Sequence, residues 1–154
     1  MEEILVFVAS FFILIAVVFI LVFRRRAGRS EQIDRLQNLQ IIPPEGVSVP
    51  IIQSFSGLKP LGGLFGISHN NLNPKLTLYD DRIEYRVIIK GSKRYIDIEQ
   101  VKTRRGRQVA FFFYGSLLTL SVWLAHPEDR STLLNFLRSR GVNLDEKARA
   151  LVNG

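Results

Sequence analysis

The amino-acid sequence predicts an α+β protein: an N-terminal transmembrane helix, then an antiparallel β-barrel or sandwich of six or seven strands closed by a C-terminal helix. Three observations support this fold class. Residues 4–23 are apolar, the period of the pattern becomes two from Lys75 onward, and a helical stripe of leucines follows Pro127. A series of short strands followed by one amphipathic helix is typical of the α+β class.

The N-terminal run, residues 4–23, has twenty consecutive positions without charge and a single hydroxyl, that of Ser10. A helix of this length covers about 30 Å, the thickness of the hydrocarbon core of a bilayer. A cleaved secretory signal would start with basic residues and end in a small-residue cleavage site. This chain starts with two acids and its bases follow the run, so we predict an uncleaved anchor.

Basic residues flank the anchor only on its C-terminal side. Because cytoplasmic flanks are enriched in Lys and Arg, we expect residues 1–3 to lie outside the cell and the rest of the chain in the cytoplasm. The predicted localisation is the cell membrane, with a single span. The flanking bases, which we also expect to contact the membrane or a partner, are Arg24, Arg25, Arg26 and Arg29.

Residues 24–44 are predicted to form a basic juxtamembrane segment with a short helix. Ser30 can cap this helix, apolar residues follow at near-helical spacing, and Pro43-Pro44 ends it. Its apolar stripe can pack on the domain, lie on the lipid surface or pair with a second copy.

The remaining length suits one small domain, predicted over residues 45–141 and clearest from residue 75. Residues 45–74 contain three prolines and five glycines, with a strand expected near Val49–Phe55 or Leu64–Ser68. The apolar loop of residues 57–66 can cover the core or insert into the membrane interface. Residues 142–154 are predicted to form a C-terminal tail, which can contain a last short helix.

From Lys75 onward, apolar and polar residues alternate, which indicates strands. The predicted strands are Lys75–Tyr79, Arg82–Val87, Arg94–Ile98, Val101–Arg104, Val109–Tyr114 and Leu117–Leu124. Turns are predicted at Asp80-Asp81, Lys90–Lys93, Arg105–Arg107 and Gly115-Ser116. Alternation places Ile96 and Ile98 on one face of their strand, and in the last strand Leu118, Leu120, Val122 and Leu124 opposite Thr119, Ser121 and Trp123.

A helix is predicted after Pro127, because proline is tolerated in the first turn and acids follow it there. Leu133, Leu134 and Leu137 form its apolar stripe. Gly141 is a suitable residue for its C-terminal stop.

Three segments have the order of a known family: KLTLYDDRIEY at 75–85, RYIDIEQV at 94–101 and LLNFL at 133–137. A leucine strand, an acidic turn, an aromatic strand, a hydrophobic-acidic-isoleucine strand and a closing helix resemble bacterial PH-like (pleckstrin homology-like) domains over about residues 75–141. The resemblance implies a strongly bent sheet or partly open barrel closed by one helix.

The resemblance to PH-like domains implies binding without naming the ligand, because these domains bind phosphoinositides, peptides or copies of themselves. The phosphoinositide-binding kind usually has bases around the loop between its first two strands. That region, residues 57–74, contains Lys59 as its only Lys or Arg here. We therefore do not expect specific capture of an inositol phosphate.

The sequence contains no set of residues typical of an enzyme active site. The absence of Cys excludes disulfides, thiolate metal sites and a Cys nucleophile. The two histidines, His69 and His126, are far apart, and Asp80-Asp81 is an ordinary turn pair. No phosphate-binding glycine loop or metalloprotease motif occurs. We expect no catalytic residue, no metal and no cofactor.

The formal net charge is +7. Besides the bases that follow the anchor, a second group of basic residues lies in and beside two predicted turns. If both turns emerge at one end of the barrel, up to seven cations can face anionic lipid or an acidic protein. We do not expect nucleic-acid binding, because the neighbouring run of three phenylalanines belongs to a strand. The predicted contact residues are Lys90, Lys93, Arg94, Lys102, Arg104, Arg105 and Arg107.

Together these observations predict a non-catalytic cytoplasmic binding module that the single span holds at the membrane. Its expected partners are membrane proteins, the anionic leaflet or both. The alternative function is a self-assembling envelope scaffold formed by homo-oligomers. An enzyme is a remote alternative.

Overall fold

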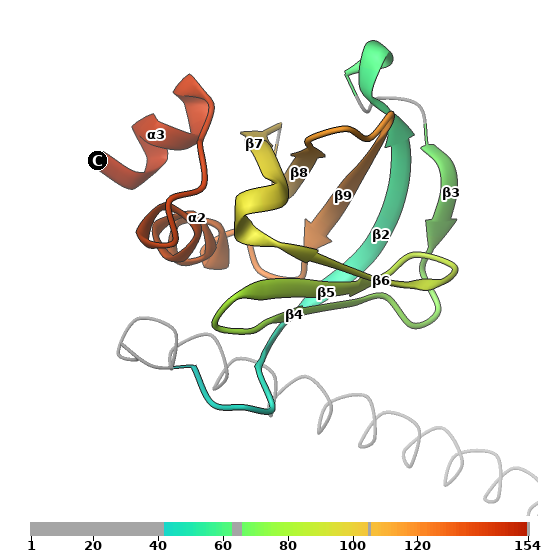
Figure 1. Ribbon diagram of the computed structural model, residues 1–154, viewed down its shortest axis with the longest axis horizontal. Coiled ribbons are helices and arrows are strands. Elements are labelled where there is room, and N and C mark those ends of the chain that lie inside the picture. The colour runs from blue at the N-terminus through green and yellow to red at the C-terminus, as the bar shows by residue number, and fades with distance from the viewer. Residues whose placement is uncertain (1–41, 63–65, 105, 154) are drawn as a thin grey trace, which may run out of the picture.

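The computed structural model describes residues 42–62, 66–104 and 106–153. Within these ranges the chain forms an α+β domain, in which two antiparallel sheets are followed by two C-terminal helices (Figure 1). This confirms the predicted class. The predicted anchor, residues 4–23, lies outside the described residues, as does nearly all of the predicted juxtamembrane segment. In the described ranges no helix is long and apolar enough to cross a bilayer.

The elements divide between the two sheets as follows. The four-stranded sheet has the order β1-β4-β5-β6, formed by Val47–Val49, Lys75–Leu78, Arg82–Arg86 and Lys90–Arg94. The five-stranded sheet has the order β3-β2-β9-β8-β7, formed by Gly66–Asn70, Ile51–Leu58, Leu118–Leu124, Gln108–Phe113 and Ile98–Thr103. Two short 3-10 helices, η1 and η2, are Lys59–Leu61 and Tyr95–Asp97, and the α-helices α2 and α3 are Asp129–Ser139 and Glu146–Asn153.

Pro50 alone separates β1 from β2, which belong to different sheets. Proline has no N–H for a ladder hydrogen bond, while its carbonyl oxygen accepts a bond of 2.8 Å from the N–H of Ala125. The next two strands follow the same bend, because β3 pairs with β2 and β4 pairs with β1. The chain thus passes twice between the sheets at one corner.

The core lies between the sheets and under α2. Phe111 of β8 and Leu120 of β9, which are register partners, are both fully buried. The predicted leucine stripe of α2 is confirmed, since Leu133, Leu134 and Leu137 are also fully buried. Burial of an amphipathic stripe is the main source of stability for a helix of this length. The last short helix, left open by the sequence, is present as α3.

The structure contradicts the predicted turn at Lys90–Lys93, because these residues belong to β6. The hairpin turn lies instead at residues 87–89, between β5 and β6. Gly91 suggested a turn, but it serves the strand: a Cβ at this position would lie 2.6 Å from the Tyr85 ring. Glycine is therefore needed in β6 so that the Tyr85 ring can lie across it.

The predicted strand Arg94–Ile98 is also wrong over Tyr95–Asp97, which form η2. Its predicted alternation fails, since Tyr95 and Ile98 are both buried while Ile96 is 77% exposed. Tyr95 takes the inward position because its hydroxyl donates to the Tyr79 carbonyl at 2.7 Å and its ring meets Phe136 edge-on at 5.9 Å. Burial accordingly raises the pKa of Tyr95 far above the ordinary value of a tyrosine.

Both faces of β9 are covered, unlike the alternation expected. Leu120, Val122 and Leu124 are buried as predicted, whereas Leu118 is about half exposed. On the opposite face Thr119 and Ser121 are buried as well. The five-stranded sheet therefore has a second face that is covered at its centre.

We expect Ser121→Ala to raise the free energy of unfolding by about 1 kcal/mol. The Ser121 hydroxyl is buried and has no hydrogen-bond partner among the described residues, and burying an unpaired polar group costs about 1–3 kcal/mol. Urea unfolding of the full chain in detergent micelles, followed by the fluorescence of its single tryptophan, measures the change.

Ser54→Ala is the matched control for Ser121→Ala, because Ser54 is equally buried but its Oγ donates to the Arg86 carbonyl at 2.6 Å. Loss of this hydrogen bond in Ser54→Ala should lower the free energy of unfolding by about 1 kcal/mol. Equal shifts in the same direction for both variants would contradict the assignment of Ser121 as unpaired.

Candidate functional site

Two connections meet where β2 and β8 finish and β9 begins, and a third, the turn at residues 87–89, follows β5 in the other sheet (Figure 1). Phe113, the last residue of β8, links the two sheets: its ring stacks on Tyr85 of β5, with centroids 6.2 Å apart and planes 11° apart. Its carbonyl oxygen accepts a 3.4 Å hydrogen bond from Lys59 Nζ of η1. The N–H of Lys59 donates to the Leu117 carbonyl at 2.7 Å. We call residues 59–61, 87–89 and 114–118 the loop end.

The loop end exposes six large apolar side chains. Their exposed fractions run from 46% for Leu61 to 81% for Ile89. The six are Leu61, Ile88, Ile89, Tyr114, Leu117 and Leu118. Isolated exposed apolar residues are common on protein surfaces, but a group on neighbouring connections, such as residues 59–61 and 114–118, marks a binding or membrane surface.

Two of the predicted contact cations, Lys90 and Lys93, lie beside the loop end. Lys93 Nζ is 5.6 Å from the centroid of the Phe113 ring. Lys90 Nζ is 3.3 Å from a carboxylate oxygen of Glu84. Burial alone would raise the pKa of Glu84, but hydrogen bonds and charges from Lys90 and Arg82 hold it below its ordinary value. Lys90 is thus paired with Glu84, while Lys93 lies against the Phe113 ring.

Lys59, the only Lys or Arg of residues 57–74, has its charge neutralised. Its ammonium group forms an ion pair with Glu99 at the start of β7. This pair agrees with the expectation that the connection does not form an inositol phosphate site, because its one cation already has an acidic partner.

The other predicted contact residues lie apart from this group. Arg94 at the end of β6 bonds to Asp97, and this hydrogen bond lowers the pKa of the Asp97 carboxyl. Lys102 lies 4.8 Å from the Phe112 ring centroid and Arg107 donates to the Ala125 carbonyl at 3.1 Å. Because β6 and β7 belong to different sheets, the two predicted basic groups occupy separate parts of the domain. The described ranges leave out Arg24, Arg25, Arg26, Arg29 and Arg105.

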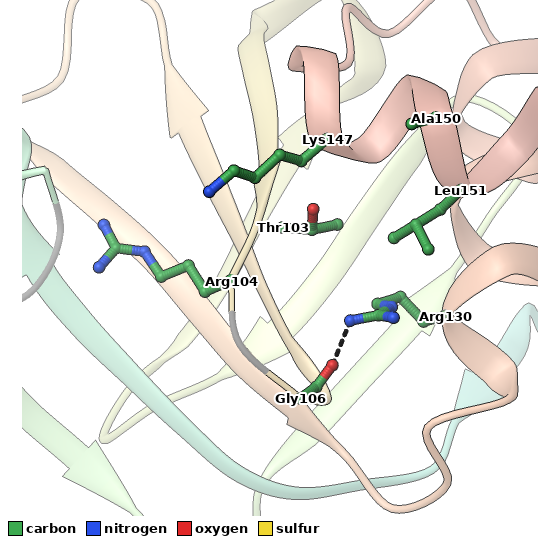
Figure 2. A pocket seen from close by; sticks show the side chains of 7 residues that line it. All are labelled: Thr103, Arg104, Gly106, Arg130, Lys147, Ala150 and Leu151. Carbon is green, nitrogen blue, oxygen red and sulfur yellow. Dashed lines mark hydrogen bonds between the residues drawn. The ribbon is translucent and has the colours of Figure 1, made fainter.

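A pocket of about 450 Å³ lies between the end of β7, the β7–β8 connection and the two α-helices (Figure 2). Its lining contains three cationic side chains and no acid. The lining residues are Thr103, Arg104, Gly106, Arg130, Lys147, Ala150 and Leu151. Of these, only Arg104 belongs to the predicted contact set. Arg130 and Lys147 were missed because they lie on helices far along the chain, and no local motif connects them with β7.

The segment between α2 and α3 positions this pocket by pairing with β7. The N–H of Val101 donates to the Asn143 carbonyl at 2.8 Å, and the N–H of Asp145 donates to the Val101 carbonyl at 2.9 Å. Asp145 Oδ1 accepts from the N–H groups of Ala148, at 2.8 Å, and Thr103, at 3.4 Å. The Asp145 carboxylate thereby caps α3 and ties its first turn to β7.

No family model matches this chain. No curated protein matches it either. The function must therefore be argued from the loop end and the pocket. Exposed apolar side chains beside cations, as at the loop end, can contact a membrane or a protein. A cationic pocket can bind an anion.

Proposed function

We propose that the protein is a membrane-anchored, cytoplasmic PH-like binding module without catalytic activity, whose loop end rests on the anionic leaflet. The observation that carries this proposal is the exposure of six large apolar side chains on the three connections of the loop end. The cation beside them, Lys93, suits the same surface.

The strand order supports the PH-like part of the proposal. If β1 with β2, and β3 with β4, are each counted as one bent strand, the domain has seven strands followed by the helix α2. This is the number and order that the resemblance implies. The additional helix α3 lies beyond that plan.

The energies favour contact of the loop end with a bilayer. Fully burying one isoleucine side chain contributes about 1.5–3 kcal/mol, and each Lys or Arg near an anionic surface adds about 1 kcal/mol. The predicted anchor keeps the domain at high effective concentration near the leaflet. Residues 24–41 could span at most about 60 Å when extended, so the tether permits the loop end to reach the lipid.

A fluorescent probe at Ile89 tests the proposal, because the chain has no Cys and a single introduced thiol can be labelled. The full chain with Ile89→Cys, labelled with the dye NBD, is reconstituted into vesicles that contain phosphatidylserine. We expect a blue-shifted emission and strong quenching by nitroxide lipids, since the probe enters the interface.

Leu151→Cys is the control for this experiment. Leu151 is also exposed, at 38%, but it lies on α3, away from the loop end (Figure 1). Its probe should keep a water-like emission. Equal emission and quenching at both positions would refute the contact of the loop end with lipid.

The same measurement examines the alternative of self-assembly. In that case the probe at Ile89 would lose water only as the ratio of protein to lipid rises, and nitroxide lipids would not quench it. This outcome would replace the leaflet by a second copy of the chain as the partner of the loop end.

A further inference from the structure

The pocket beside α3 combines cations from three separate elements. Arg104 follows β7, Arg130 lies on α2 and Lys147 lies on α3. In Figure 2 the Lys147 side chain extends from α3 toward the side on which Arg104 lies, and Arg130 lies across the pocket beside Gly106. Like charges gathered from distant parts of a chain repel one another unless an anion lies between them.

Two of these cations are bonded to backbone carbonyls. Arg104 donates through Nη2 to the Gly62 carbonyl, and Arg130 donates through Nη1 to the Gly106 carbonyl. Gly106 lines the pocket, so its bond places the Arg130 guanidinium there before the ligand arrives, which lowers the entropy lost on binding. A guanidinium has five N–H donors, so Arg130 retains donors for a ligand. Gly62 does not line the pocket, so the Arg104 guanidinium is directed to its edge.

Lys147 completes the set as a charge without a described counterion. Its ammonium group forms no ion pair or hydrogen bond within the described part of the chain. The neighbouring acid Asp145 accepts hydrogen bonds from the backbone of Thr103 and Ala148. Even if Asp145 is counted in full, the three cations leave a net charge of +2 at the pocket.

The charge and size of the pocket select the ligand chemistry. A phosphomonoester carries about −1.5 to −2 at pH 7 and three strong acceptor oxygens, whereas a carboxylate carries −1 and two oxygens. The volume of about 450 Å³ lies within the range of about 300–1,000 Å³ found for small-molecule sites. Ala150 and Leu151 of α3 supply an apolar wall for the rest of the molecule.

We propose that this pocket binds a phosphomonoester, with Arg130 and Lys147 as its donors and Arg104 as a further positive charge at its edge. Arg suits the phosphate because its planar fork can give two parallel hydrogen bonds, and Lys adds a compact charge. The phosphate can belong to a soluble metabolite or to a lipid headgroup. This binding does not depend on the contact of the loop end with the leaflet.

Calorimetric titration of the full chain in nanodiscs tests the pocket. In phosphatidylcholine nanodiscs the chain is titrated with glycerol 3-phosphate, and in a second series the discs contain phosphatidic acid, whose effect is measured by the protection of a Lys147-directed amine label. Saturable binding of glycerol 3-phosphate identifies a soluble ligand. Protection by phosphatidic acid without binding of glycerol 3-phosphate identifies a headgroup, and either result supports the proposal.

Lys147→Met separates the pocket from general attraction between opposite charges. Lys147 is exposed, so the change should leave the fold intact, and losing one charge-assisted hydrogen bond of about 1.5–3 kcal/mol should weaken binding of glycerol 3-phosphate at least about tenfold. Lys75→Met, an exposed lysine of β4 that does not line the pocket, should bind as the unchanged chain does.

Two outcomes would overturn the phosphomonoester site. One is the absence of both glycerol 3-phosphate binding and protection by phosphatidic acid in the unchanged chain. The other is equal weakening by Lys147→Met and Lys75→Met, which would mean that the ligand responds to net charge alone. In either case the probe at Ile89 still decides independently whether the loop end contacts lipid.

Discussion

Replacing Phe111 with alanine is expected to lower the free energy of unfolding by about 3–5 kcal/mol. Phe111 is fully buried in β8, where its register partners are Val101 of β7 and Leu120 of β9. Both partners are themselves fully buried. Removing the ring therefore loses its transfer free energy and leaves a cavity in the middle of a paired sheet, where the neighbouring strands cannot close in.

Urea unfolding of the full chain in detergent micelles, followed by tryptophan fluorescence, measures this loss. Tyr114→Ala is the control, because this aromatic side chain lies three positions along the chain and is 63% exposed. Its removal should change the free energy of unfolding by at most about 0.5 kcal/mol. A loss below about 1 kcal/mol for Phe111→Ala would mean that the core does not centre on β8.

The second large effect is expected from the double variant Ile88→Glu and Ile89→Glu. These two side chains are the most exposed of the loop end, at 71% and 81%. If each contributes about 1.5–3 kcal/mol when buried in lipid, losing both should reduce the ratio of lipid-bound to free loop ends by about 100-fold or more. Two acids near an anionic surface add repulsion in the same direction.

A reporter at Leu117→Cys measures the release, because Leu117 belongs to the same loop end but to another connection. Nitroxide lipids should quench its probe in the otherwise unchanged chain and fail to do so in the double variant. Leu151→Glu, made in the same labelled chain, should leave the quenching as it was. Undiminished quenching in the double variant would exclude the turn at residues 87–89 from the lipid contact.

Periodicity predicted the parts of the fold in which one face is buried and the other exposed. The hairpin of β4 and β5 and the helix α2 follow from alternation and from the leucine stripe, because burial imposes those periods. The strand β6 has no such signal. Its sequence KGSKR has no apolar residue, and what makes it a strand is pairing of its backbone with β5.

The candidate sites were predictable only where neighbours in sequence are neighbours in space. Lys90 and Lys93 belong to the predicted contact set, and both lie beside residues of the loop end. Ile88 and Ile89 carried an unused signal, because a tight turn usually contains Gly, Asn, Asp or Pro. The sequence carried no signal for the pocket, because Arg104, Arg130 and Lys147 are brought together only when α3 packs beside β7.

The pairing of β2 with β9 also has a consequence for how the protein is made. The partners in this ladder are 60 positions apart at Leu58 and Leu118 and 73 apart at Ile51 and Leu124. Contacts so distant in sequence pay a large loop-closure entropy before they add any stability, which slows folding. The larger sheet cannot be completed until Leu124 has left the ribosome, by which time the N-terminal segment has long been synthesised. The five-stranded sheet therefore forms only after most of the domain has been synthesised.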